Sequence, residues 1–292
     1  MGKRVFLFLL TNLAIMVVLS SVLALLGIGS YIGTDGQLQL GALLAFCFIW
    51  GMGGAFISLQ MSRWIAKRAM GVQLVDGRTG NEALDWLYNT VSQQAQQANL
   101  PVPEIGVYAS DEVNAFATGP SKKRSLVAVS TGLLQSMERR EVAAVTAHEV
   151  GHIANGDMVT MTLIQGVVNA FVLFFSRIIA FAVRQVVDER IAWVVGFVVT
   201  ITLDILLGFL GSLVTAWFSR HREFRADAMG AQLAGRENMV GALKRLASNA
   251  GRIDTSHAAL ATMKISGKKS WLQAFSTHPP IEERIAALQA GR

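Results

Sequence analysis

The sequence predicts an α-rich integral membrane protein, with four hydrophobic transmembrane helices and a mainly helical soluble part that contains a small β-sheet. Two observations predict this class. Apolar residues make up 52% of the 292-residue chain and charged residues only 16%, a balance that is unusual for a soluble protein. The apolar residues also gather in four runs that are each long enough to cross a bilayer.

The net charge of +6 is better explained by a membrane than by nucleic acid. Lys and Arg lie beside the apolar runs, where they set topology and attract anionic lipid. No stretch combines aromatic and basic residues as a nucleic-acid platform does, so we expect no nucleic-acid partner. The single Cys47 lies inside an apolar run, which excludes a disulfide framework and a Cys-based zinc site within one chain.

The first two apolar runs, 5–26 and 38–59, predict a transmembrane hairpin that occupies residues 1–62. Basic residues flank the outer ends of the pair and are absent from the loop between: Lys3, Arg4, Arg63, Lys67 and Arg68. The positive-inside rule then places the N-terminus and the soluble part in the cytoplasm. A cleaved signal peptide begins in a similar way, but the first run is longer than a signal core and a second run follows closely. Gly51, Gly53, Gly54 and Ala55 would let these two helices approach each other closely.

Residues 63–157 are expected to form the first part of a cytoplasmic domain. An amphipathic pattern predicts a helix over 81–99, and short β-like pieces follow at 105–108, 115–118 and 126–130. The middle piece begins at Asn114, Ala115 and Phe116. An edge strand there could bind an extended peptide as an additional strand, although an ordinary edge strand fits the pattern equally well.

The stretch His148-Glu149-Val150-Gly151-His152 has the spacing of a metalloprotease motif. Nothing breaks a helix between Ser136, which could cap its start, and Asn155. Residues four apart share a helical face, so both imidazoles can point at one Zn²⁺, and Glu149 can take a proton beside it. Because a catalytic zinc usually has three protein ligands, one more ligand must come from elsewhere.

Residues 158–218 predict a second apolar hairpin, with Arg177 in its first run and Asp204 in its second. A charge inside a span usually faces protein or water, so the two could pair. If the hairpin turn is at 184–190, Arg177 lies about 10 Å from it and Asp204 about 20 Å, which makes direct pairing doubtful. Whether this hairpin crosses the bilayer completely is left open.

Residues 219–292 are expected to complete the cytoplasmic domain and to supply the third ligand. Glu223 and Asp227 are four apart and share one helical face. One could bind zinc while the other holds a ligand His by its free ring nitrogen. A solvated charge cluster is the alternative for the pair, and His221 is another candidate ligand. His257 stands in a stretch without a readable pattern.

His278 lies in Thr277-His278-Pro279-Pro280, before an expected C-terminal helix. It could donate a hydrogen bond to a developing oxyanion, or it could only brace that helix.

These motifs together resemble the HtpX family of membrane-embedded zinc metalloproteases over almost the whole chain. The residues that carry the resemblance are Asn114 to Gly119, His148 to Asp157, Ser219 to Asp227, and Thr277 to Pro280, with the two apolar hairpins. The resemblance implies a zincin-type protease domain that binds one Zn²⁺ per chain. It implies that His148, His152 and Glu223 are the ligands and that Glu149 is catalytic.

The resemblance also implies a multi-pass protease of the bacterial inner membrane, with its active site facing the cytoplasm. Its expected substrates are misfolded or damaged membrane proteins and unfolded polypeptides, cleaved as part of a stress response. A non-catalytic scaffold with a structural zinc would need a fourth protein ligand or no Glu149, and a metal transporter would need polar ligands within the spans. The only charged residues there are Arg177 and Asp204.

Overall fold

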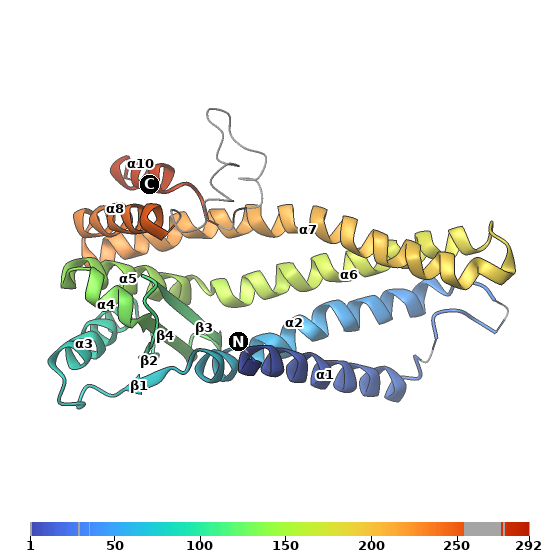
Figure 1. Ribbon diagram of the computed structural model, residues 1–292, viewed down its shortest axis with the longest axis horizontal. Helices are drawn as coiled ribbons and strands as arrows, with labels where there is room; N and C mark the ends of the chain where they lie inside the picture. Colours follow the sequence, from blue (N-terminus) through green and yellow to red (C-terminus); the bar gives the residue numbers. More distant parts are fainter. Residues whose placement is uncertain (1, 29, 35, 254–275, 277, 292) are drawn as a thin grey trace. The chain divides into compact units, whose positions relative to one another are not determined.

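The computed structural model describes all residues except 1, 29, 35, 254–275, 277 and 292. The chain forms two compact units, each built from two separate segments (Figure 1). One unit contains residues 1–60 and 160–216 and is called here the membrane unit. The other contains residues 61–159 and 217–292 and is called the soluble unit.

Four helices supply the membrane unit: α1 (Gly2–Leu25), α2 (Leu40–Met70), α6 (Asp157–Arg184) and α7 (Glu189–Ala234). In the described part of the chain, α2, α6 and α7 are long and apolar enough to cross a membrane. In α1 the qualifying apolar stretch, Leu13–Leu25, is shorter, so the first of the four predicted spans stays a prediction.

Glycines allow close contacts between these helices. Not all of these contacts lie at the predicted interface between α1 and α2. A Cβ at Gly53 would lie 2.6 Å from Leu19 of α1, as expected for the first hairpin. A Cβ at Gly51 would instead lie 2.5 Å from the backbone nitrogen of Ala170, so Gly51 serves the α2–α6 contact. The prediction was wrong at Gly51 because residues two apart on a helix point to different sides.

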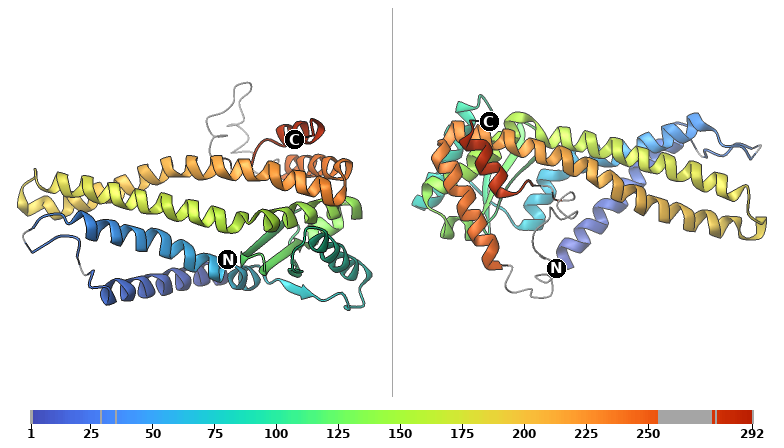
Figure 2. Two further views of the ribbon diagram at one scale, coloured as in Figure 1. Left: turned by 180° about the vertical axis from the view of Figure 1, so that it is seen from behind. Right: turned by 90° about the horizontal axis from the view of Figure 1, so that it is seen from above.

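Helices α6 and α7 run side by side (Figure 2). Their alignment brings Arg177 and Asp204 together: Nη1 lies 2.8 Å from both carboxylate oxygens, and Ser176 donates to the same carboxylate at 2.5 Å. The ion pair between Arg177 and Asp204, which the sequence made doubtful, therefore forms. Residue 176 lies opposite residue 204, and Arg184 lies against Gly196. The hairpin is therefore centred at about residue 190, beyond the centre of the expected turn. Arg177 and Asp204 consequently lie at nearly equal distances from the turn and can meet.

The soluble unit contains one four-stranded sheet in the order β1-β2-β4-β3. Its strands are β1 (Gln73–Val75), β2 (Glu104–Tyr108), β3 (Ala115–Ser121) and β4 (Arg124–Ser130). Strands β2 and β4 are parallel, and the other two pairs are antiparallel. The three predicted strands are present with β3 at an edge, whereas β1 was too short to show a pattern.

Among the described residues, five further helices belong to the soluble unit: α3 (Glu82–Gln97), α4 (Thr131–Ser136), α5 (Arg139–Asn155), α8 (Arg236–Ile253) and α10 (Ile281–Gln289). The helix expected from Ser136 begins three residues later, because Ser136 ends α4. Glu138 caps α5 instead, in a reciprocal capping box with Glu141.

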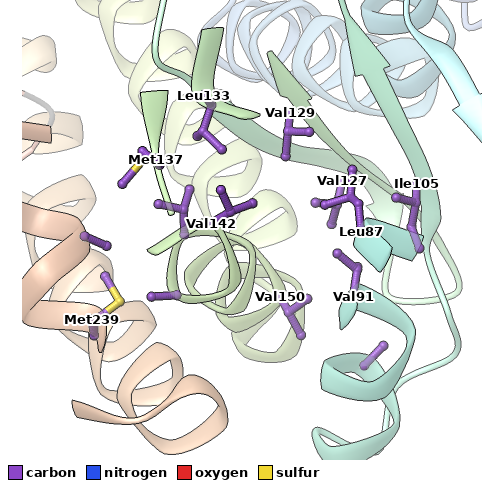
Figure 3. Close-up of a cluster of buried hydrophobic side chains, with 14 of the residues drawn as sticks. Leu87, Val91, Ile105, Val127, Val129, Leu133, Met137, Val142, Val150 and Met239 are labelled. Atoms are coloured by element: carbon purple, nitrogen blue, oxygen red, sulfur yellow. The ribbon is translucent and has the colours of Figure 1, made fainter. Parts of the chain in front are cut away.

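The core of the soluble unit holds α5 between the sheet, α3 and α8 (Figure 3). Val142 and Val150 of α5 are buried together with Val127 of β4, Leu87 of α3 and Met239 of α8. Burying each such side chain contributes about 1.5–3 kcal/mol. Because its neighbours enclose α5 on several sides, the helix is a rigid support for the residues on its remaining face.

Candidate metal centre

His148 and His152 lie one turn apart on α5 and are both buried. Their ring centroids are 4.6 Å apart, and the two Nε2 atoms are 3.1 Å apart. Gly156 ends the helix with a φ of 72°, a left-handed conformation that favours glycine. The predicted convergence of the two imidazoles is therefore present.

Glu223 of α7 completes the cluster and is fully buried. Its Oε1 lies 3.4 Å from His152 Nε2, and its Oε2 lies 3.6 Å from His148 Nε2. A Cβ at Gly151 would lie 3.1 Å from the carbonyl oxygen of Ala226, so the glycine in the motif allows α7 to approach α5. This close approach places the carboxylate beside the imidazoles.

These three residues fit a metal ion. One possible ligand atom from each lies within 4.8 Å of the others. In the described part of the chain, the buried Glu223 Oε1 has no hydrogen-bond partner, and a buried carboxylate oxygen without a partner is costly. Two imidazole nitrogens and one carboxylate oxygen form a ligand set typical of catalytic zinc.

Two buried carboxylates hold the outer nitrogens of the histidines. Asp227 lies 2.8 Å from His148 Nδ1, and Asp157 lies 2.7 Å from His152 Nδ1. A carboxylate accepts the Nδ1–H, which leaves the Nε2 lone pair directed toward the centre of the cluster. Asp227 occupies the position that the sequence suggested. The sequence did not predict a role for Asp157. The only sequence feature that could have suggested one is its position five residues after His152, at the start of α6.

Arg284 of α10 is a second residue that the sequence did not reveal. Its Nε and Nη2 donate to the two oxygens of Asp227 at 2.7 and 2.6 Å. Its Nη1 lies 3.6 Å from Glu223 Oε2, and the residue is only 7% exposed. A single cation thus faces both Glu223 and Asp227 of α7. No local pattern marked this arginine, because its partners are 57 and 61 residues earlier in the sequence.

His278 is brought to the same cluster. Its Nδ1 lies 2.8 Å from Glu223 Oε2, while the side chain is 60% exposed. His221, the rival ligand, is exposed and bonds through Nδ1 to the carbonyl of Trp217 at 2.9 Å. It does not belong to the cluster. The rival His257 lies outside the described residues.

Glu149 follows His148 on α5 and is half-buried. Its negative charge acts on both histidines and on Arg284, so the carboxylate lies beside the cluster. Strand β3 packs against the same helix. Ala115 and Phe116 pair with Val129 and Ala128 of β4, and Asn114 immediately precedes them.

The histidines are basic in the metal-free protein. Burial lowers the pKa of His152, but the negative carboxylates of Asp157 and Glu223 beside the ring outweigh burial and raise that pKa to about 9. Burial also lowers the pKa of His148, but the negative carboxylates of Asp227 and Glu223 outweigh burial, and the pKa of His148 is raised. Both side chains are thus surrounded by negative charge, which also attracts a cation.

The described cluster agrees with comparisons to known proteins. Residues 82–292 match the model of peptidase family M48. "Protease HtpX homolog" of Bacillus licheniformis is 51% identical, over 99% of this chain and 100% of its own length. "Protease HtpX" of Aeromonas hydrophila subsp. hydrophila is 50% identical, over 98% of this chain and 99% of its own.

A solved structure shares the fold. The crystal structure of S. mikatae Ste24p aligns with a TM-score of 0.63 at 19% identity, over 99% of this chain and 67% of that one. The family match covers most of the chain, the relatives are about half identical over nearly all of it, and the His-His-Glu cluster fits a metal ion. The chain therefore belongs to peptidase family M48 and is a membrane-embedded metalloprotease.

Proposed function

We propose that this protein is a zinc-dependent endopeptidase of the bacterial inner membrane that cleaves misfolded or damaged membrane proteins and unfolded polypeptides on the cytoplasmic side, during stress. The observation that carries the proposal is the convergence of His148, His152 and Glu223, each with an ordered partner. Relatives of bacterial origin that are named proteases support it.

Zinc is the proposed ion, one per chain, held by His148 Nε2, His152 Nε2 and the carboxylate of Glu223. Borderline-soft Zn²⁺ suits imidazole together with a carboxylate better than the hard ions Mg²⁺ and Ca²⁺ do. When bound, zinc would supply Lewis acidity toward a carbonyl group or water. Asp227 and Asp157 keep both histidines in the tautomer that binds metal.

Glu149 is the proposed general base. Its half-buried carboxylate lies beside the cluster without belonging to it, so it is available to accept a proton from the attacking water. It would then pass that proton to the leaving amine, as a positioned carboxylate can. His278 is proposed to donate a hydrogen bond to the developing oxyanion, since its exposed ring already reaches Glu223.

The substrate backbone is proposed to pair with the outer edge of β3, through Asn114, Ala115 and Phe116. Strand β3 is the last strand of the sheet on its side, and it packs against the helix that carries His148 and His152. An extended peptide added at this edge would gain main-chain hydrogen bonds. Such binding accepts many sequences, as cleavage of unfolded chains requires.

Replacing Glu149 tests the mechanism. Glu149→Gln keeps the size of the side chain but removes the base, so zinc content should stay normal while cleavage of a model membrane substrate falls by about 10²–10⁴-fold. Mass spectrometry of the fragments and metal analysis measure the two properties. His278→Ala should lower kcat in the same assay, with zinc retained.

Glu282→Gln, at an exposed glutamate of α10, is the matched control and should behave as wild type. Wild-type cleavage by Glu149→Gln would contradict the proposed base. Normal zinc binding without cleavage by the wild-type protein would favour a structural zinc in a scaffold.

A further inference from the structure

Arg222 lies on α7 immediately before Glu223 and takes no part in the proposed metal binding. Its Nε is 3.9 Å from Glu223 Oε1. That carboxylate oxygen also faces His152 Nε2 at 3.4 Å and has no hydrogen-bond partner in the described part of the chain. The guanidinium group of Arg222 therefore lies at the edge of the metal centre, on the side of His152.

Arg222 differs from the other arginines around the centre in having unused hydrogen-bond donors. Arg284 donates twice to Asp227, and Arg225 lies 3.5 Å from Asp157. The contact of 3.9 Å made by Arg222 is too long for a hydrogen bond, and its Nε is buried without a partner among the described residues. Because its side chain is 25% exposed, its N–H groups can still bind a ligand that approaches from solvent.

Neutralising Glu223 does not explain the position of Arg222. Arg284 Nη1 already lies 3.6 Å from Glu223 Oε2, and His278 Nδ1 lies 2.8 Å from the same oxygen. A cation that is partly removed from water costs free energy unless an acceptor compensates it. The arrangement instead suits an acceptor that is present only when a substrate is bound.

The backbone of a substrate peptide supplies such an acceptor. If the peptide pairs with the edge of β3, as proposed above, only the carbonyl groups on one of its edges are used, and those on its other edge need separate donors. An extended chain advances about 3.3–3.6 Å per residue. A carbonyl group one residue from the bond that is cleaved at the cluster is therefore within reach of a guanidinium group beside Glu223.

We propose that Arg222 is a substrate-binding residue that donates hydrogen bonds to a main-chain carbonyl group next to the scissile bond. This inference rests on the proposed protease function. A main-chain acceptor is favoured over an acidic side chain, because cleavage of unfolded polypeptides requires contacts that every sequence offers. Arginine suits this role because its guanidinium group stays charged and presents its donors in a rigid plane.

Peptide binding tests the proposal without cleavage. Full-length, zinc-loaded Glu149→Gln protein in detergent is titrated with a fluorescein-labelled casein peptide, whose cleavage site has first been mapped with the wild-type protein by mass spectrometry. Adding Arg222→Gln should weaken binding, measured by fluorescence anisotropy, about ten- to a hundredfold, since hydrogen bonds from a charged group are lost. Adding Arg222→Lys should give an intermediate affinity, because lysine keeps the charge but not the planar donors. Adding Arg245→Gln, at an exposed arginine of α8, is the matched control and should leave the affinity unchanged.

A peptide that contains a thioamide identifies the acceptor. Sulfur accepts hydrogen bonds more weakly than oxygen, so replacing the carbonyl oxygen next to the scissile bond, on each side in turn, should weaken binding at one of the two positions. The same replacement should have little further effect once Arg222→Gln is present, because both changes remove the same hydrogen bond.

Zinc content and the thermal unfolding temperature separate substrate binding from a structural role. Both should be the same in the variants with Arg222→Gln and with Arg245→Gln. Loss of zinc on adding Arg222→Gln would mean that Arg222 only stabilises Glu223 and would overturn the proposal, as would equal peptide affinity in these two variants. If Arg222→Gln fails to fold, Arg222→Lys decides the outcome.

Two other results would also overturn the inference. Loss of affinity only for peptides with an acidic residue next to the scissile bond would assign Arg222 to a side chain instead of a carbonyl group. Failure of the zinc-loaded wild-type protein to cleave casein would contradict the proposed function itself. Cleavage by the wild type together with equal affinities in the variants would contradict this inference alone.

Discussion

At the scale of single residues, Arg284 connects the last helix to the metal centre. Its two hydrogen bonds to Asp227 fix the carboxylate that holds His148. Arg284→Ala would leave Asp227 buried without its cation, so we expect zinc affinity to fall by about 10–100-fold. Competition with a chromophoric chelator measures this.

Arg284→Lys separates charge from geometry. Lysine keeps the charge but cannot donate two parallel hydrogen bonds, so its zinc affinity should lie between those of wild type and Arg284→Ala. Arg245→Ala, at an exposed arginine of α8 that lies 3.8 Å from Glu141, should leave zinc affinity unchanged. An effect of equal size at both positions would mean that Arg284 acts on general stability only.

The pKa of about 9 for His152 predicts how metal binding depends on pH. Protons compete with the metal for Nε2, so the apparent zinc affinity should rise as pH increases from 6 and level off above about 9. In the metal-free protein, folding stability changes with pH in the opposite direction to zinc affinity. The charged imidazole then stabilises the fold fully below pH 6.5, and this contribution is lost as pH rises through about 9.

Asp157→Asn supplies the control for this pH dependence. It removes a partner that raises the pKa of His152, so the rise in zinc affinity should move to lower pH. Chelator competition over a pH series, with wild type and Asp157→Asn side by side, measures the shift. Identical pH profiles for the two proteins would rule out this coupling.

At the scale of elements, the contact between α2 and α6 depends on Gly51. A Cβ there would lie 2.5 Å from a backbone atom of Ala170, whereas a Cβ at Gly41 of the same helix meets no atom within 4 Å. Gly51→Val should therefore destabilise the membrane unit by about 1–3 kcal/mol. Gly41→Val makes the same chemical change in open space.

Thermal unfolding in detergent compares the two variants. We expect a lower unfolding temperature for Gly51→Val than for Gly41→Val. Equal temperatures would show that loss of glycine, rather than the helix contact, decides the result.

At the scale of the whole molecule, the apolar runs predict four spans, and the distribution of basic residues predicts that the soluble unit lies in the cytoplasm. Single cysteines at Lys123, Asp188 and Ser248, all exposed, test this in intact cells after Cys47→Ala. Positions 123 and 248 should react with an impermeant thiol reagent only after the membrane is opened. Position 188 should react from outside if the second hairpin crosses completely. Labelling of position 123 in intact cells would reverse the proposed topology.

Local patterns were enough for much of this protein. The apolar runs of α2, α6 and α7 predict membrane helices because hydropathy needs no knowledge of distant residues. The spacing of His148 and His152 and of Glu223 and Asp227 predicts shared faces because helical periodicity relates residues four apart. These local patterns left Glu223 and Asp227 both open as the third ligand, and the resemblance to the HtpX family implied the cluster of His148, His152 and Glu223.

Only the tertiary structure decided which distant residues meet. The bonds from Arg284 to Asp227, the pairing of Arg177 with Asp204 and the contact of Gly51 with Ala170 depend on how helices dock. Asp157 is close in sequence to His152, yet its role depends on the turn at Gly156. Local periodicity determines which side of a helix a residue occupies, but packing between elements determines its partner, and that packing depends on the whole chain.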